Sequence, residues 1–313
     1  MSSSHGPDLL GWMRLYTDAS ILCCLANLDS STASQSITDL DRVLIFCGSA
    51  SGRVDLVFTI ISDIQKTYLP VYPFDSRIHT SLQHHCRANA SLSSSHHDIP
   101  SLPAPPSLTT FQSSWSNSPF IIRRYAQDWP AMKEHPWKSA AYLRAASGPG
   151  RVVPVEVGQD YRENDWTQIL VSWDTFLSHL ELEDQPSPSV SSKTLYLAQH
   201  DLLMQFPALR KDIIIPDYVY SDVRPSSCPD YGSPGNDEKL IINAWVGPKG
   251  TISPAHTVSA PRFSRRRQPS VVPRTLISTY LVSQHIPLRC MTHASVLLLS
   301  TSCGLQDHLA GSA

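Results

Sequence analysis

The sequence lacks a strong excess of charge, and this absence argues against several classes of partner. Of its 313 residues, 25 are lysine or arginine and 27 are aspartate or glutamate, which gives a formal net charge of -2. A chain so close to neutrality has no general attraction to nucleic acid or to an anionic membrane, so any basic surface must be local. Its length and its 41% hydrophobic content allow a sizeable core.

The sequence also lacks paired cysteines and long apolar runs. Its seven cysteines are an odd number without CxxC spacing, which disfavours both a disulfide framework and a thiolate zinc site. No basic segment followed by an apolar one begins the chain, and no apolar run approaches about 18 residues. We therefore expect a reducing compartment, nuclear and/or cytoplasmic, with neither secretion nor membrane spanning.

Apolar residues recur at three- and four-residue spacing in the first part of the chain. Val54, Val57, Ile61 and Ile64 show this helical period, and a similar pattern precedes them. The small residues of Cys47–Gly52 separate two such stretches. The sequence predicts a helical N-terminal module over residues 1–76, with two or three amphipathic helices between residues 8 and 65.

Residues 77–106 are rich in serine, histidine and proline and poor in large apolar side chains. Such a composition cannot pack and is typical of a linker without regular structure. The pairs His84-His85 and His96-His97, with Cys86, are an alternative set of metal ligands. In low-complexity polar sequence we favour the solvated linker.

From residue 107 onward, short strands and short helices alternate. No GxGxxG follows a strand, so a doubly wound sheet is disfavoured and a barrel-like or sandwich β core with helical decoration is favoured. The expected fold class is α+β. Strands are predicted at Phe120–Ile122, Arg151–Val157, Thr194–Ala198 and Leu240–Val246, and helical segments at His135–Ala146, Trp173–Leu180 and Leu202–Leu209.

The stretch Leu240–Thr257, LIINAWVGPKGTISPAHT, combines an apolar strand, a tight turn and a potential metal ligand. In a strand, His256 and position 258 would point to the same side, so a His-x-acid pair there could bind one metal ion. With a distant second histidine, such a pair gives the two-His, one-carboxylate face of a non-haem iron oxygenase. A lone histidine more often packs or donates a hydrogen bond, so the motif alone is weak.

Four stretches in this order resemble the JmjC (cupin-type) Fe(II)/2-oxoglutarate oxygenases, and within them the branch described as lysine-specific demethylase eight or arginyl hydroxylase. Together they cover roughly residues 107–257. They are PFIIRRYAQDWPA (119–131), GRVVPVEVG (150–158), LYLAQHDLLMQFPALRKDIIIPDY (195–218) and INAWVGPKGTISPAHT (242–257).

The resemblance implies a double-stranded β-helix that uses Fe(II) and 2-oxoglutarate to hydroxylate or demethylate a side chain of a protein or histone tail. His256 then resembles the first iron ligand. Tyr196 and Ser253 resemble residues that hydrogen-bond 2-oxoglutarate, and Gln199, Trp245 and Thr251 resemble the lining of its pocket. As alternatives, the two aromatic residues would serve equally as core, and Thr251 and Ser253 would satisfy turn backbone.

After Thr257 the chain departs from the family pattern. The acid ligand is replaced by Val258, and no lysine follows Lys249 to bind the co-substrate. His285, His293 and His308 lack the sequence context of the distal ligand. We therefore expect an incomplete double-stranded β-helix in residues 107–257, without activity and without stoichiometric Fe(II) or 2-oxoglutarate.

Residues 258–313 form a tail unlike the family. Its arginines, from Arg262 to Arg274, allow a weaker alternative of nucleic-acid binding, which the overall charge disfavours. Our preferred hypothesis is a retained intron or misplaced exon boundary after Thr257, with a disordered tail in which only Val296–Leu299 could add a strand. A second functional alternative is a non-catalytic interaction module that binds a partner through the N-terminal helices.

Overall fold

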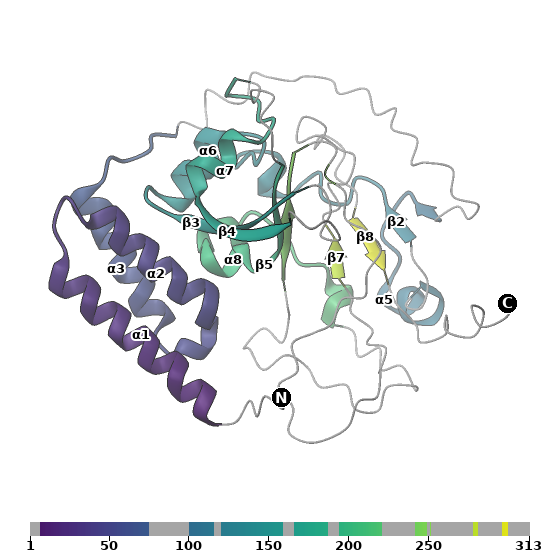
Figure 1. Cartoon of the computed structure of the whole chain (residues 1–313). Coiled ribbons are helices and arrows are strands. Elements are labelled where there is room, and N and C mark those ends of the chain that lie inside the picture. Colours follow the sequence, from purple (N-terminus) through teal and green to yellow (C-terminus); the bar gives the residue numbers. More distant parts are fainter. Residues whose placement is uncertain are drawn as a thin grey trace, which may run out of the picture.

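The computed structural model describes residues 7–74, 100–115, 120–158, 166–186, 194–220, 242–248 and 251, together with two strands in the tail. Figure 1 shows helices α1, α2 and α3 as one layer, a sheet beside them under helices α6 and α7, and a second small sheet farther along. The expected α+β class is confirmed.

Three helices make up the N-terminal layer, as the helical spacing predicts. Helix α2 contacts both α1 and α3. Its Gly48 has φ +50° and the following Gly52 has φ +67°, left-handed conformations that end one helix and start the turn into the next. The elements are α1 (Pro7–Asn27), α2 (Ala33–Cys47), η1 (Gly48–Ser51) and α3 (Val54–Tyr68). Their shared core consists of Ile21, Cys24, Ala33, Ile37, Leu40, Val43, Leu44, Val57, Ile61 and Ile64.

Helix α1 also has the length and composition of a membrane span over Leu9–Asn27. The stretch contains Arg14 and Asp18, so it is not an uninterrupted apolar run, and the expectation that the chain does not span a membrane stays a prediction. Core helices of soluble proteins and signal sequences share these properties, so the finding by itself places nothing in a membrane.

The larger sheet has the strand order β4-β3-β5-β6, with every neighbouring pair antiparallel. Alternate residues of its strands point into the main apolar core, where Val153, Val155 and Leu197 are almost fully buried. Helices α6, α7, α8 and α9 surround this core. The elements are β3 (Val152–Val157), β4 (Thr167–Ser172), β5 (Leu195–His200), β6 (Ala244–Val246), α6 (Ala140–Ser147), α7 (Trp173–Ser178), α8 (Leu202–Gln205) and α9 (Pro207–Arg210).

The second sheet has the order β1-β2-β8-β7, in which β1 and β2 are parallel and the other pairs antiparallel. Its two tail strands show that the tail is not wholly without regular structure, and the expected strand at Val296–Leu299 is confirmed. Its strands and the short helices near it are β1 (Ser101–Leu102), β2 (Phe120–Ile122), β7 (Ser278–Tyr280), β8 (Val296–Leu299), α5 (Leu108–Thr110), η2 (Phe111–Trp115), η3 (Pro130–Met132) and η4 (Asp217–Tyr220).

Several sequence-based boundaries need correction. Strand β1 lies within the range 77–106, which was expected to lack regular structure. Strand β4 was missed, because an edge strand with mostly exposed residues has little apolar alternation. The described strands form two separate four-stranded sheets and do not by themselves establish a double-stranded β-helix.

Helix α6 begins at Ala140 rather than His135. Ser139 caps it by accepting a hydrogen bond from the backbone N–H of Tyr142 at 3.0 Å. The preceding residues are held in a turn because His135 and Trp137 both bond the buried carboxylate of Asp212, at 2.7 and 2.8 Å. Similarly, the expected helix Leu202–Leu209 divides into α8 and α9, where Pro207 starts the second helix.

A buried polar cluster joins the helical layer to the larger sheet. Asp41 of α2 is fully buried, and its Oδ1 lies 2.7 Å from Nη2 of Arg151, which is 5% exposed. The same carboxylate accepts hydrogen bonds from the backbone N–H of Val152 at 2.9 Å and from Nε2 of Gln205 at 2.9 Å. The guanidinium also lies 4.6 Å from the ring centre of Phe206. Each partner of this carboxylate comes from the sheet domain, so the cluster fixes α2 against it.

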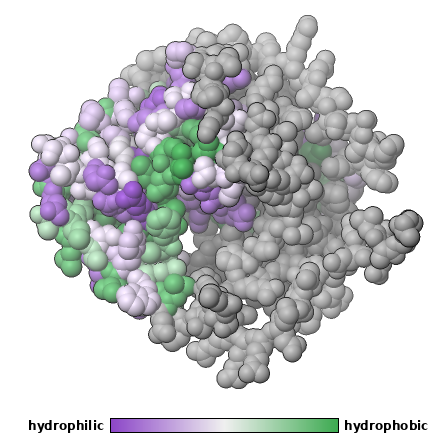
Figure 2. Space-filling model, in the orientation of Figure 1, coloured by the Kyte–Doolittle hydropathy of each residue, from purple (hydrophilic) through white to green (hydrophobic). Residues whose placement is uncertain are grey.

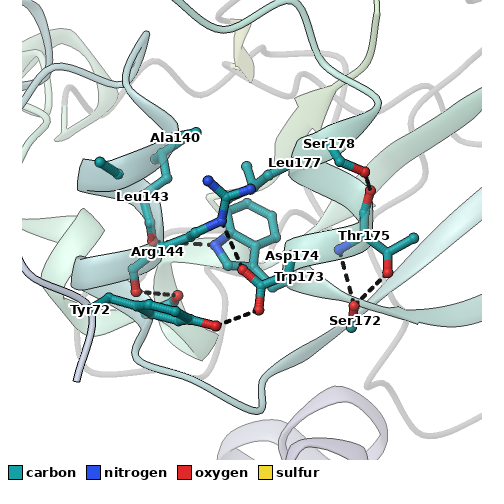
Figure 3. A network of polar contacts seen from close by, with 12 residues as sticks. Tyr72, Ala140, Leu143, Arg144, Ser172, Trp173, Asp174, Thr175, Leu177 and Ser178 are labelled. Carbon is teal, nitrogen blue, oxygen red and sulfur yellow. Dashed lines mark hydrogen bonds and ion pairs between the residues drawn. The ribbon is translucent and has the colours of Figure 1, made fainter. Parts of the chain in front are cut away.

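Two further contacts extend this junction along α3 and the segment after it. Gln65 donates through Nε2 to the backbone oxygen of Pro149 at 2.8 Å. Tyr72 donates its hydroxyl to Asp174 at 2.8 Å, while Arg144 binds the other oxygen of that carboxylate at 2.8 Å (Figure 3). Burial and the bond to Asp174 raise the pKa of the Tyr72 hydroxyl to about 12.

Candidate functional site

The side of the larger sheet that faces away from the apolar core carries the candidate site. In β5, Leu195 and Leu197 point into the core, so the alternation of the strand turns Tyr196 to the opposite side. Glu156 of β3 lies directly across from Tyr196 in the ladder. We call this side the open face of the sheet.

Strand β6 brings a second aromatic residue to the same face. Val246 pairs with Leu197 and packs against the main core, so the next residue back, Trp245, lies on the open face with Tyr196. Gly247, one position farther along, then lies opposite Tyr196. The antiparallel register therefore places Tyr196, Trp245 and Gly247 together on this face.

Gly247 is the point where the strand and the following turn meet. A Cβ at Gly247 would lie 2.6 Å from Oγ1 of Thr251 and 2.9 Å from Cδ2 of Tyr196, closer than real Cβ contacts come. The missing side chain thus allows the turn to approach Tyr196. Thr251 itself donates its hydroxyl to the backbone oxygen of Pro248 at 2.7 Å, which fits the alternative reading in which it supports the turn.

Strand β5 contains an irregularity beside these residues. Its pairing with β6 shifts register between Leu197 and His200, and Gln199 within that bulge has φ +49°. A residue with a side chain rarely adopts this left-handed conformation, and strain of this kind is typical of functional sites. Gln199 is exposed, so the bulge presents its amide at the end of the strand.

His200, the next residue, points the other way. It is 8% exposed and its Nε2 lies 2.6 Å from Oε1 of Gln205. Burial lowers the pKa of the His200 imidazole, although the bond to Gln205 and the charge of Asp41 oppose this shift. Because Gln205 also bonds Asp41, the bulge is connected through His200 to the junction with the helical layer.

The structure therefore brings together Tyr196, Trp245 and Thr251 of the sequence-predicted residues, with Gln199 on the same strand as Tyr196. Ser253, His256 and Val258 lie outside the described residues, so the structure does not test the predicted metal ligand. Within the described ranges, no group of three His, Cys, Asp or Glu side chains could hold a metal ion.

Two residues of this face were not singled out from the sequence. Glu156 is the polar position in the alternating strand VVPVEV, and that alternation was the available signal. Gly247 directly follows the apolar residues of β6, and a glycine at a strand end is a recognised sign of close backbone approach.

Known proteins similar to this chain share one kind of domain. Jumonji C domain-containing protein 5 of Drosophila melanogaster is 39% identical over 161 residues, covering 51% of this chain and 36% of that protein. Lysine-specific demethylase 8 of Danio rerio is 34% identical over 304 residues, covering 93% of this chain and 68% of that protein. Lysine-specific demethylase JMJ30 of Arabidopsis thaliana is 37% identical over 139 residues, covering 44% of this chain and 28% of that protein. No family model matches the chain.

The extent of these matches bears on the sequence predictions. The matched segments span only 36% of the fly protein and 28% of the Arabidopsis protein. The zebrafish match covers 93% of this chain and therefore continues past Thr257. That residues 258–313 are unlike the family stays a prediction.

Proposed function

The chain belongs to the JmjC family, and we propose that it retains the co-substrate-binding face of a family oxygenase while lacking a complete iron site. Two of the relatives are named lysine-specific demethylases. From these names and the motif resemblance we propose a side chain of a protein or histone tail as the substrate class, with hydroxylation or demethylation as the family reaction. From the unpaired cysteines we propose a nuclear or cytoplasmic location.

The contact at Gly247 is the observation that supports this proposal most directly. A Cβ there would clash with both the Tyr196 ring and Thr251, so only a glycine lets the turn that carries Thr251 pack directly against Tyr196. This close packing would fix the position of the Tyr196 ring, whose hydroxyl would be one donor to a co-substrate on the open face. Hydroxyl and amide groups are suitable donors for the carboxylates of 2-oxoglutarate, and the exposed Gln199 lies on the same strand as Tyr196.

In the family reaction, Fe(II) and 2-oxoglutarate supply the oxidation of a C–H bond. The residues of this chain would bind and orient the co-substrate. Tyr196 would donate to one carboxylate, Gln199 would donate at the bulge, and Trp245 would exclude water from one side of the molecule. The predicted roles of Ser253 and Thr251 belong to the same proposal.

The iron ligands in this sequence do not fit a two-His, one-carboxylate centre. Position 258, where the family carries the acid, is Val258, whose side chain has no donor atom. His256 would then be one ligand of three. No lysine follows Lys249 to pair with the co-substrate. We therefore propose that this chain binds Fe(II) below one equivalent and does not turn over.

A binding and activity experiment on the full chain tests the proposal. We expect 2-oxoglutarate to give a saturation-transfer NMR signal with the protein, and no succinate above the rate without protein. The variant Gly247→Ala should abolish the binding signal because its methyl group would push Thr251 and the Tyr196 ring apart and displace both from the binding face. Gly11→Ala is the matched control, since a Cβ at Gly11 meets nothing within 4 Å. Equal signals from both variants, or succinate from the unaltered chain, would contradict the proposal.

A second experiment tests the metal part alone. The variant Val258→Asp adds a carboxylate two positions after His256, and we expect it to strengthen Mn(II) binding about tenfold over the unaltered chain, measured by electron paramagnetic resonance. Val258→Asn is the control, because an uncharged amide of similar size should give a smaller gain. No difference between the two variants would mean that His256 and position 258 do not share one metal ion.

The origin of the tail can be decided from nucleic acid. Comparing the transcript with the genomic sequence across the codon of Thr257 should reveal a splice donor if residues 258–313 come from a retained intron. An uninterrupted transcript without such a donor would reject that explanation and leave the substitution by Val258 as a property of the protein itself.

The alternative function, a non-catalytic interaction module, is favoured by one observation. Helix α1 exposes large apolar side chains, including Trp12, Leu15 and Leu22. A pull-down partner that is lost on substitution of these residues, with the sheet domain unchanged, would support it over co-substrate binding.

A further inference from the structure

Helix α1 exposes its most apolar side to solvent. Trp12 is 66% exposed, Leu15 57% and Leu22 66%. By contrast, Asp18 lies toward the rest of the layer, where its carboxylate binds Arg53 of the α3 N-terminus at 2.8 Å. A helix at the surface of a protein ordinarily shows the reverse arrangement, so this side of α1 is suited to contact another surface.

The exposed apolar residues follow a regular pattern. Trp12, Leu15, Ala19, Leu22 and Ala26 are all exposed and are separated alternately by three and four residues. This is the spacing of positions a and d over two heptads, the pattern by which two helices pack along their length. We call these five residues the α1 stripe. Figure 2 shows apolar side chains on the surface over the helical layer.

The charges of α1 disfavour a membrane contact in which the helix lies in the headgroup region. Interfacial membrane helices carry several lysines or arginines opposite their apolar side. Between Leu9 and Asn27, helix α1 has a single basic residue, Arg14, and one acidic residue, Asp18. The heptad spacing instead indicates another helix.

The sizes of the side chains indicate which helix. The stripe has Trp12 and Leu15 at its N-terminal end, Ala19 at its centre and Ala26 at its C-terminal end. Two parallel copies would place tryptophan against tryptophan and alanine against alanine, which leaves a clash and a gap. Two antiparallel copies crossing at Ala19 place Trp12 of each against Ala26 of the other, and the paired alanines at the centre allow close approach. This orientation also aligns the helix dipoles favourably.

We propose that the α1 stripe is the contact of a two-fold symmetric, antiparallel homodimer of this chain. Its exposed apolar side chains, together with neighbouring Tyr16, would bury about 500 Å² per copy, below the ~800 Å² per partner of a standard stable interface. The dimer is therefore weak and dissociates on dilution within the micromolar range.

Sedimentation of the full chain over a range of concentrations tests the proposal. The unaltered chain should shift from monomer to dimer, and Leu22→Glu should weaken this association at least tenfold because it places a charge within the stripe. Phe46→Glu is the matched control, because Phe46 is 60% exposed on α2, outside the stripe. Both variants alter exposed positions, so both should keep the far-ultraviolet spectrum of the unaltered chain.

Engineered cysteines test the antiparallel geometry in a Cys23→Ser background. Ala19→Cys should give a disulfide-linked dimer on mild oxidation. Trp12→Cys alone and Ala26→Cys alone should each form much less disulfide-linked dimer than Ala19→Cys does. A mixture of the two variants should form a disulfide between Cys at position 12 of one copy and Cys at position 26 of the other. Parallel packing would predict the reverse result, with Trp12→Cys linking to itself.

Three results would overturn the proposal. The first is a chain that stays monomeric over the whole concentration range. The second is a dimer that Phe46→Glu disrupts as strongly as Leu22→Glu. The third is binding of the monomer to vesicles of phosphatidylcholine and phosphatidylserine through the stripe, which would assign this surface to a membrane.

Discussion

The junction between the helical layer and the sheet differs sharply from the open face of that sheet. At the junction, the Asp41 carboxylate is fully buried and accepts bonds from Arg151, Gln205 and the backbone of Val152. At the open face, Gln199 is exposed and occupies a left-handed backbone conformation. At the junction, the buried carboxylate is paired with a guanidinium and with further hydrogen-bond donors. At the open face, a polar side chain and a strained backbone lie near solvent.

This difference separates residues that hold the fold from residues that are available for binding. A buried charge must be paired, because an unpaired one costs several kcal/mol, so the junction residues have little freedom to do anything else. Strained backbone beside exposed side chains contributes nothing to stability and persists where it serves a function. Substitutions at the junction should therefore change stability, and substitutions at the open face should change binding.

The largest expected effect is at Asp41. Asp41→Ala leaves the guanidinium of Arg151 buried without its carboxylate and should lower the free energy of unfolding by about 3–5 kcal/mol, measured by urea denaturation. The control is Asp39→Ala, which removes an exposed pair with Arg42 and should cost at most about 0.5 kcal/mol. Similar losses from the two variants would mean that the helical layer is not fixed to the sheet by this cluster.

A smaller effect is expected at Tyr72. Tyr72→Phe removes the hydrogen bond to Asp174 and should lower the free energy of unfolding by about 1 kcal/mol near neutral pH. Tyr68→Phe is the control, because Tyr68 is exposed at the end of α3.

The same residue predicts a pH dependence. The folded-state pKa of Tyr72 is raised to about 12, above the usual value of 10.0, so the folded protein holds this proton more tightly than the unfolded chain. Its contribution is complete below pH ~10 and is lost as the pH rises toward ~12. Between these values the unaltered chain should lose more stability than Tyr72→Phe does. Parallel stability curves for the two proteins would contradict the raised pKa.

Patterns local to the chain predicted much of the fold. The helical spacing of Val57, Ile61 and Ile64 corresponds to buried residues of α3, and Phe120–Ile122 is a strand with the predicted bounds. These elements could be predicted because one apolar face determines both the spacing of the apolar residues and which of them are buried. Strand β4 could not be predicted, since its place in the sheet depends on pairing with β3 rather than on an alternation in its own sequence.

The candidate site was predictable only in part, for a similar reason. Resemblance to family motifs identified Tyr196, Trp245 and Thr251, which the structure places around one point. The role of Gly247 depends on contacts across β5, β6 and the following turn, which no spacing along the chain encodes. The bonds of Asp41 join residues 110 or more positions apart, so the junction was also invisible in the sequence.

The smallest predicted stability effect has the opposite sign and lies at the bulge. Gln199→Gly relieves a left-handed conformation at φ +49° and should raise the free energy of unfolding by about 0.5–1 kcal/mol, while loss of the amide weakens 2-oxoglutarate binding. Gln199→Ala is the matched variant, because it removes the same amide but keeps the strain, so it should weaken binding equally without the gain in stability. Urea denaturation and saturation-transfer NMR on both variants separate the two effects. If Gln199→Gly and Gln199→Ala have equal free energies of unfolding, the bulge holds no strain. The junction and the open face would then differ only in how far their polar groups are exposed to solvent.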